Sequence, residues 1–446
     1  MTSTILFAVL IGIIVLLVLI LALRIHAFIS LLIASIIVGL LAGLSPTEII
    51  NTVQTGMGGT LGFVATVVGL GAILGGILEA SGGTNAIVKF MIDKFGINRA
   101  PTALAISGFI IAIPVFFDVA FIILVPVIYT LQRKTKKSLL LYAIPILAGL
   151  ATTHAFIPPT PGPVAVSEII GAQLGWVILV GFLAGIPSVI ISGLWFGKRI
   201  ANKLFIEAPQ IQTMDEEIEK LPNVWSVLAI ILIPIVLILL NTTIGLFIED
   251  TNPSNPVYAT ISFLGHPFIA LILANVIAWY FLGKRNKYSA KQLLEISTKS
   301  LLPAGTIILL TGAGGVFKQI LVDTNAGTLI AEMMQNLGLP IILFAFITAA
   351  LIRIIQGSAT VAMITAAGLI SPLLLTTTFS DFQLATIVIA IASGASILSH
   401  VNDSGFWLVS QYLGLSEKQT FKSWSVMTTF IAITGFIVAF ALHLMF

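Results

Sequence analysis

The feature that most constrains this chain is the length of its uncharged, apolar stretches. Residues Ile5–Leu23 carry no charge, and one helix needs about 20 apolar residues to cross the hydrocarbon core of a bilayer. Similar stretches recur at Ala27–Leu44, Ala172–Gly197, Val224–Ile248, Val257–Leu282, Phe382–Ser399 and Trp424–Leu442, and two longer tracts, Ala100–Gln132 and Ile354–Ser399, contain only Asp118 and Asp381. The pattern predicts an all-α polytopic membrane protein with roughly ten to fourteen membrane elements.

Charge is too scarce for any other class of protein. Only 9% of the 446 residues are charged, whereas soluble domains carry about 25%. This composition excludes soluble enzymes, nucleic-acid-binding proteins and disordered chains, and the absence of cysteine excludes disulfides and thiolate metal sites. Basic clusters at Arg133–Lys137, Lys198–Lys203 and Lys284–Lys291 predict cytoplasmic loops. No basic residue precedes the first apolar stretch, which we interpret as a retained helix rather than a signal peptide.

The sequence contains two related halves. Ser45–Gly56 aligns with Ser289–Ser300 at an offset of 244 (289 − 45), and Thr153–Pro163 aligns with Ser399–Val409 at an offset of 246 (399 − 153). The alternative explanation is that helices rich in Gly, Ser and Thr resemble one another everywhere. The near-constant offset favours duplication, with a first repeat at 1–200, a cytoplasmic linker at 201–223 and a second repeat at 224–446.

The two repeats are expected to face opposite ways across the membrane. The basic loop Arg133–Lys137 corresponds to a segment around Asp381 that has no basic residue, so one is predicted inside and the other outside. Inverted repeats with interrupted helices are typical of secondary transporters, which bind their substrate near the bilayer midplane.

A first pair of glycine-rich segments is predicted to re-enter the membrane and turn back. These segments are Gly69–Thr84, which contains Glu79, and Gly312–Thr328. The broken backbone would line a wet cavity and offer N–H donors to an anion, so Gly82 and Gly83 are candidate substrate ligands and Glu79 is a candidate for proton coupling. The alternative is close helix packing through small residues.

A second pair of segments, Ala151–Pro163 and Ile397–Trp407, combines helix-breaking residues with polar side chains. Hydroxyl and amide groups suit a polyhydroxylated substrate, and the candidate ligands are Thr152, Thr153, Thr160, Ser399 and Asn402. The candidates for proton coupling are His154, His400 and Asp403. The alternative role for the two histidines is hydrogen bonding in helix packing.

Two charged residues stand alone in apolar surroundings. Asp118 lies in IPVFFDVAFIILVP, and an acid in the membrane is costly unless it is paired or wetted, so it is a further candidate for proton coupling. Arg353 is a candidate ligand for a carboxylate, and it precedes further candidate ligands at Gln356, Gly357, Ser358 and Thr360. The alternative for each is a structural ion pair, or for Arg353 an extended side chain reaching the interface.

The segments FFDVAFIILVP, THAFIPPTPGP, IRIIQGSATVAM, SHVNDSGFWLV and LGGILEASGG together resemble the gluconate permease family of proton symporters. The resemblance covers nearly the whole chain. It implies proton-coupled import of a sugar acid, most commonly gluconate, across the bacterial inner membrane. It also implies paired re-entrant hairpins, a scaffold region with a moving transport region, and a homodimer.

Other functions remain open at this point. Sodium coupling, D-serine or another hydroxy acid as substrate, and an anion channel are all compatible with the same architecture. A membrane-embedded enzyme would need a constellation such as HExxH or GxSxG, and the sequence contains neither. The five histidines have no metal-ligand spacing, so the sequence predicts no enzyme, cofactor or metal, and its partners are a small organic anion, a proton and the lipid bilayer.

Overall fold

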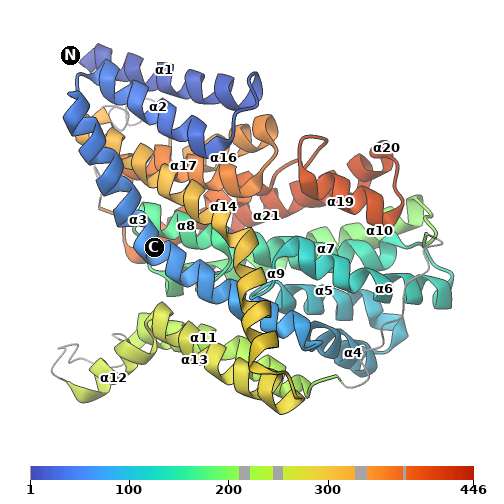
Figure 1. The fold of residues 1–446 in the computed structure, drawn as a ribbon. Helices are drawn as coiled ribbons and strands as arrows, with labels where there is room; N and C mark the ends of the chain where they lie inside the picture. The colour runs from blue at the N-terminus through green and yellow to red at the C-terminus, as the bar shows by residue number, and fades with distance from the viewer. Residues whose placement is uncertain (1, 210–220, 245–254, 327–338, 375–377, 446) are drawn as a thin grey trace.

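The structure, a computed structural model, describes residues 2–209, 221–244, 255–326, 339–374 and 378–445, and within these ranges every regular element is a helix (Figure 1). The first half contains α1 (Thr2–Leu21), α2 (Ala27–Ala42), α3 (Pro46–Ala80), α4 (Gly83–Phe95), α5 (Ala100–Ile111), α6 (Phe117–Thr135), α7 (Leu140–Phe156), α8 (Pro161–Ile170), α9 (Leu174–Val189) and α10 (Phe196–Lys203). The second half contains α11 (Val224–Thr243), α12 (Pro256–Leu264), α13 (Pro267–Ala278), α14 (Ala290–Asp323), α16 (Ile341–Gln356), α17 (Ala359–Leu374), α18 (Asp381–Ser396), α19 (Ser404–Leu413), α20 (Glu417–Thr420) and α21 (Val426–Met445).

The two longest helices, α3 and α14, begin in the same way. Ser45 and Ser289 are their N-caps, 244 positions apart (289 − 45), and each hydroxyl accepts a hydrogen bond from the backbone N–H three residues further on. The side chains of Glu48 and Gln292 accept from the N–H groups of the two cap residues, which completes a capping box at both sites. The repeat inferred from the sequence therefore has the same helix boundary in both copies.

These two helices cross in opposite directions (Figure 1). Along α3 from its beginning, the contacts on α14 run from its end towards its beginning: Thr52 with Asp323, Gly56 with Gly315, and Gly76 with Ser300. Equivalent helices that run antiparallel belong to repeats of opposite orientation. The predicted all-α fold with two inverted repeats is thus confirmed.

The prediction that Gly69–Thr84 and Gly312–Thr328 re-enter the membrane is wrong. Helix α3 continues unbroken to Ala80 and α14 continues unbroken to Asp323, while residues 327 and 328 lie outside the described residues. A helical glycine costs only about 1 kcal/mol, and this cost is offset where the missing side chain lets another helix approach. A Cβ atom at Gly315 would lie only 2.6 Å from the carbonyl oxygen of Gly56, and one at Gly75 would overlap the carbonyl oxygen of Pro114, so the alternative of close packing applies here.

Re-entrant hairpins do occur, but elsewhere in each repeat. Helices α5 and α6 meet at a tip formed by 112–116, and α16 and α17 meet at 357–358. In addition, α7 and α8 are separated by a break at 157–160, and α18 and α19 by a break at 397–403. Prolines account for the first break, and Gly357, with φ of +93°, makes the second hairpin tip possible. Each repeat therefore contains one hairpin and one interrupted helix, at corresponding places in the two copies.

In the described ranges seven helical segments are long and apolar enough to cross a bilayer, and six shorter apolar helices accompany them. The predicted stretch Val257–Leu282 is divided at His266, which caps α13, with Pro267 at its first position.

Helices α1 and α2 lie at one end of the crossed pair α3 and α14, and α11 to α13 lie at the other end (Figure 1). The hairpins and interrupted helices pack between them with α9 and α21. The predicted ranges of repeats and linker stay a prediction, and residues 210–220 of that linker lie outside the described residues.

Candidate functional site

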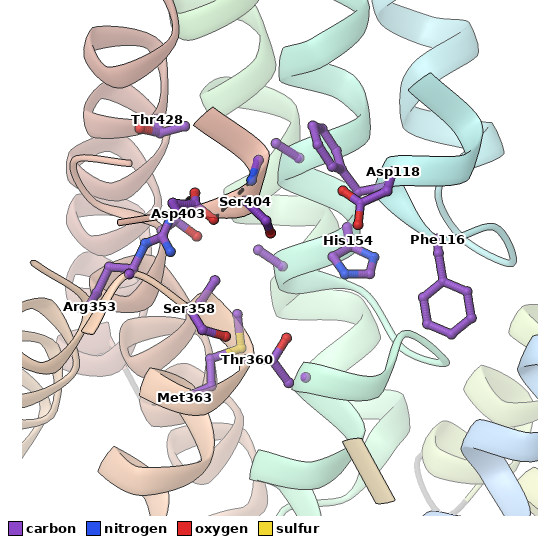
Figure 2. A pocket seen from close by; sticks show the side chains of 18 of the residues that line it. Phe116, Asp118, His154, Arg353, Ser358, Thr360, Met363, Asp403, Ser404 and Thr428 are labelled. Atoms are coloured by element: carbon purple, nitrogen blue, oxygen red, sulfur yellow. Dashed lines mark hydrogen bonds and ion pairs between the residues drawn. The ribbon is translucent and has the colours of Figure 1, made fainter. Parts of the chain in front are cut away.

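The two hairpin tips and the two helix breaks surround one cavity of about 570 Å³ (Figure 2). Its wall draws on both repeats and on one of the two crossed helices, since Pro303 and Ile307 of α14 also line it. The polar part of the lining is formed by Asp118, His154, Arg353, Gln356, Ser358, Thr360, Ser396, Asn402, Asp403, Ser404, Trp424 and Thr428. Segments far apart in the sequence thus bring ionisable, hydroxyl and amide groups to a single place.

Four helices begin at this wall, namely α6, α8, α17 and α19. The first N–H groups of a helix have no partner inside the helix and carry a partial positive charge. At α19 the Asp403 carboxylate accepts from the N–H of Gly405 at 3.1 Å, and at α17 the hydroxyl of Ser358 accepts from the N–H of Val361 at 3.4 Å. Helix α6 follows Phe116, whose side chain makes no capping hydrogen bond. The start of α6 therefore presents uncapped donors to the cavity.

Arg353 forms an ion pair inside the wall. Its Nη2 atom lies 2.5 Å from Oδ2 of Asp403, and the two side chains are only 4% and 13% exposed. The Nε and Nη1 atoms of Arg353 are buried and have no hydrogen-bond partner among the residues that the structure describes. Because a guanidinium has five N–H donors in a planar fork, Arg353 retains donors beyond those that its partner Asp403 uses.

The carboxylate of Asp403 is held from several sides. Besides Arg353, the hydroxyl of Ser399 donates to it, and Ser399 in turn accepts from Nε1 of Trp424 at 2.6 Å. The backbone N–H of Ser399 donates to Thr428 at 3.2 Å, so the network connects the break before α19 to the beginning of α21. Asp403 is consequently a fixed counter-ion with all its partners already present.

Asp118 lies opposite this pair. Figure 2 shows Asp118 and His154 on one side of the cavity, and Arg353 and Asp403 on the other. Asp118 belongs to the first turn of α6, and among the described residues no hydrogen bond or ion pair engages it. The Nδ1 atom of His154 is buried and has no partner in the described part of the chain. The cavity therefore contains one acid that is paired and one acid that is not.

The hydroxyl and amide groups come mainly from the second repeat. Ser358 and Thr360 lie side by side below the ion pair in Figure 2. Gln356 has an unpartnered Oε1 atom, whereas Nδ2 of Asn402 donates to the carbonyl oxygens of residues 354 and 355 at 3.1 Å each. These side chains can bind the hydroxyl groups of a polar ligand in the cavity.

Of the seventeen residues singled out from the sequence, the structure brings a first group to the cavity wall and places the others elsewhere. The first group is Asp118, His154, Arg353, Gln356, Gly357, Ser358, Thr360, Asn402 and Asp403. Three threonines of the first repeat are turned away from the cavity: Thr152 and Thr153 are fully buried within α7, and Thr160 donates to the carbonyl of residue 157. Ser399 and His400 lie behind the wall. Gly82 and Gly83 lie at the beginning of α4, and Glu79 lines a separate chamber. Roles for this second group stay a prediction.

Several lining residues were not predicted. Ser404 lies inside the predicted segment Ile397–Trp407 and Ser396 directly precedes it, so the sequence pointed to these two hydroxyls although neither was chosen as a ligand. Trp424 and Thr428 come from the last membrane helix, where a polar residue among apolar ones gave no signal of its own. Only the packing of α21 against α18 brings them to the site.

A cavity with charged and hydroxylated walls, enclosed by inverted repeats with hairpins and interrupted helices, defines a membrane transporter. The chain belongs to the GntP permease family, because the model of that family, described as GntP family permease, matches residues 4–445. The family and the long apolar helices make it a multi-pass protein of the bacterial inner membrane.

Curated relatives of the chain are permeases of similar length. The low-affinity gluconate transporter of Escherichia coli K12 is 40% identical over 397 residues, which cover 89% of this chain and 88% of the relative. The gluconate permease of Pseudomonas aeruginosa is 36% identical, with 90% and 89% covered. The Gnt-II system L-idonate transporter of Escherichia coli K12 is 35% identical, with 90% of both chains covered.

A solved structure has the same fold. The YdaH transporter of Alcanivorax borkumensis, whose crystal structure is described as revealing an unusual topology, superimposes with a TM-score of 0.63. The match covers 89% of each chain at 14% sequence identity. This likeness supports the architecture of hairpins and crossed helices.

Proposed function

We propose that the protein imports gluconate by proton symport. Relatives named as gluconate transporters at 36–40% identity support the substrate. The observation that carries the mechanism is the charge of the cavity: one buried Arg–Asp pair, one acid without a partner among the described residues, and the N-termini of four helices.

The substrate carboxylate would bind where positive charge is concentrated. The start of α6, on the same side of the cavity as Asp118, offers uncapped backbone N–H groups. The hydroxyl groups of the sugar acid would bind Ser358, Thr360 and Gln356 on the opposite wall. A ligand with a carboxylate at one end and a polyol chain at the other matches this arrangement.

Asp118 is the proposed coupling group. The charged residues in the lining are Arg353, Asp403 and Asp118, so the wall has a net charge of minus one when Asp118 is ionised and zero when it is protonated. Electrostatic repulsion in a site of low dielectric constant is strong. A proton on Asp118 therefore favours binding of the anion, and loss of that proton in the cytoplasm favours its release.

Two measurements test this proposal. In proteoliposomes, labelled gluconate is expected to accumulate under an inside-alkaline pH gradient, and a protonophore should abolish the accumulation. Uptake that follows a sodium gradient and ignores the collapse of the pH gradient would refute proton coupling. Gluconate binding should weaken from mildly acidic to mildly alkaline buffer in the native protein and stay constant in Asp118→Asn.

Competing functions are separated by the same preparation. Competition by L-idonate, D-serine and other hydroxy acids ranks the substrates, and the L-idonate relative makes that sugar acid the second candidate. Saturable, concentrative uptake distinguishes a symporter from a channel, and recovery of unaltered gluconate distinguishes it from an enzyme. We further propose a homodimer, as the resemblance implies, which the mass of the detergent-solubilised protein tests.

A further inference from the structure

A second, smaller chamber lies beside the substrate cavity. It has a volume of about 50 Å³, and because one water needs about 10–15 Å³, it is large enough for a few water molecules. Helix α3 contributes Glu79, the first hairpin tip contributes Pro114 and Phe116, and α14 contributes Ser300 and Pro303. Glu79 is the titratable residue among those that line this chamber.

Phe116, Val119 and Pro303 line both the chamber and the substrate cavity, and Phe116 is the aromatic residue among them. Phe116 also lines a minor third cavity that it shares with His154. Its ring centroid is 6.2 Å from that of His154, and Figure 2 shows the Phe116 ring beyond His154, on the side away from Arg353. An aromatic ring at the tip of a hairpin thus forms part of the wall between the cavity of Asp118 and the chamber of Glu79.

The tip that carries Phe116 rests directly on α3. A Cβ atom at Gly75 would overlap the carbonyl oxygen of Pro114, so only glycine allows this contact. Glu79 lies one helical turn beyond Gly75 on the same helix. The position of Phe116 relative to Glu79 is therefore set by the contact between the hairpin and the long helix, and it changes if that contact moves.

Glu79 lies at the cytoplasmic end of α3. The carbonyl of Ala80 accepts from the hydroxyl of Tyr288 at 2.6 Å, next to the basic segment 284–291 that the sequence places in the cytoplasm. No ion pair involves Glu79 among the described residues. On α14, which packs against α3, the nearby Lys299 pairs with Glu295 at 2.8 Å and is exposed. Glu79 is consequently an acid without a partner, between the chamber and the inner surface.

We propose that Glu79 accepts the coupled proton on its way to the cytoplasm and that Phe116 is the barrier controlling this transfer. This inference rests on the proposed symport. When the Phe116 ring moves aside, the O–H bond of protonated Asp118 breaks, water in the chamber carries the proton, and an O–H bond forms on the Glu79 carboxylate. Glu79 then releases the proton to cytoplasmic water, and Asp118 is left ionised.

The first test separates net transport from exchange in proteoliposomes. Net uptake requires the proton to leave, whereas exchange of internal for external gluconate proceeds with the proton still bound. We expect Glu79→Gln to slow pH-driven uptake on the order of tenfold or more, to leave exchange close to the native rate, and to leave the pH dependence of gluconate binding unchanged. Glu79→Asp should restore most of the uptake.

The matched control is Glu295→Gln, which removes an exposed acid from α14 and should leave both uptake and exchange unchanged. If Glu79→Gln lost uptake and exchange equally, Glu79 would have a structural role only. If uptake and exchange both kept their native rates in this variant, Glu79 would not lie on the proton route. Either result overturns the inference while the native protein still transports gluconate. Failure of the native protein to couple gluconate to protons would instead overturn the proposed function.

The second test concerns the barrier. Without gluconate, we expect Phe116→Ala vesicles to take up protons faster than native vesicles under an inside-negative potential, followed with an internal pH dye. Phe116→Leu, which retains a bulky apolar side chain, should remain as tight as the native protein. A Phe116→Ala protein that transports gluconate and shows no proton leak would contradict the role of Phe116.

Discussion

At the residue scale, the central feature is the buried pair of Arg353 and Asp403. Sequence reasoning placed both at the site but assigned them separate roles, because a pairing over 50 positions leaves no trace in one sequence. The geometry makes Asp403 the fixed partner of Arg353, and it leaves Asp118 as the unpaired acid. Thr152 and Thr153 show a second limit of prediction from sequence. They were predicted as ligands because they lie near a helix break, but a hydroxyl in that position can equally point into the surrounding helices, as theirs do.

Removing one partner of this pair should be costly. Asp403→Asn leaves a guanidinium buried without its counter-ion, which costs on the order of 3 kcal/mol and should lower the midpoint of thermal unfolding in detergent. Lys299→Gln breaks an exposed ion pair instead and should change stability by less than about 1 kcal/mol. Equal midpoints for Asp403→Asn and the native protein would show that the pair does not stabilise the fold.

A second residue-scale prediction concerns Gly357 at the second hairpin tip. Its φ is +93°, and a Cβ atom there would overlap the backbone carbonyl of Asn402, so Gly357→Ala should abolish transport. Gly43 has a similar φ of +96° with open space around it, so Gly43→Ala bears only the conformational cost of about 1 kcal/mol. Uptake and protein yield should therefore separate the two variants, and equal behaviour would rule out a role for the contact with Asn402.

At the scale of elements, the sequence predicted the helices well and the hairpins poorly. Capping boxes, prolines and uncharged runs fix where most helices begin and end. The glycine-rich segments of α3 and α14 were misassigned because glycine has the same local signature in a broken helix and in a close helix crossing. Only the partner helix distinguishes these two uses, and the partner lies more than 200 residues away.

The crossing of α3 and α14 gives a prediction at this scale. Gly56→Val places methyl groups against the backbone of Gly315 and should push the two helices apart, with a loss of stability of about 1–3 kcal/mol. Gly58→Val, two residues further along the same helix, meets nothing within 4 Å and is the control. A Gly56→Val protein as stable as Gly58→Val would contradict the close crossing.

At the scale of the whole molecule, the repeat and its inversion could be predicted from offsets and charges, whereas the meeting of the four breaks at one cavity could not. That meeting depends on how α5, α7, α16 and α18 pack together. An apolar helix face does not indicate in the sequence which other helix it will pack against.

The inversion has a direct test, because the chain contains no cysteine. Lys137→Cys follows α6 and Thr378→Cys precedes α18, at corresponding places in the two repeats. A membrane-impermeant maleimide should label Thr378→Cys in intact cells and Lys137→Cys only after the membrane is opened. Labelling of both from the same side would contradict opposite orientations.

The two hairpin tips touch different partners. Pro114 of the first tip rests on α3, whereas Gly357 of the second rests on the neighbouring break. Two halves of one fold thus occupy unlike arrangements, and under the proposed mechanism we expect the form that opens to the other side to exchange these arrangements between them. Such an exchange of arrangements does not by itself favour transport in one direction. Ion and solute concentrations alone decide which way cargo travels, and a cell loaded with the solute in alkaline surroundings would lose it through the same protein.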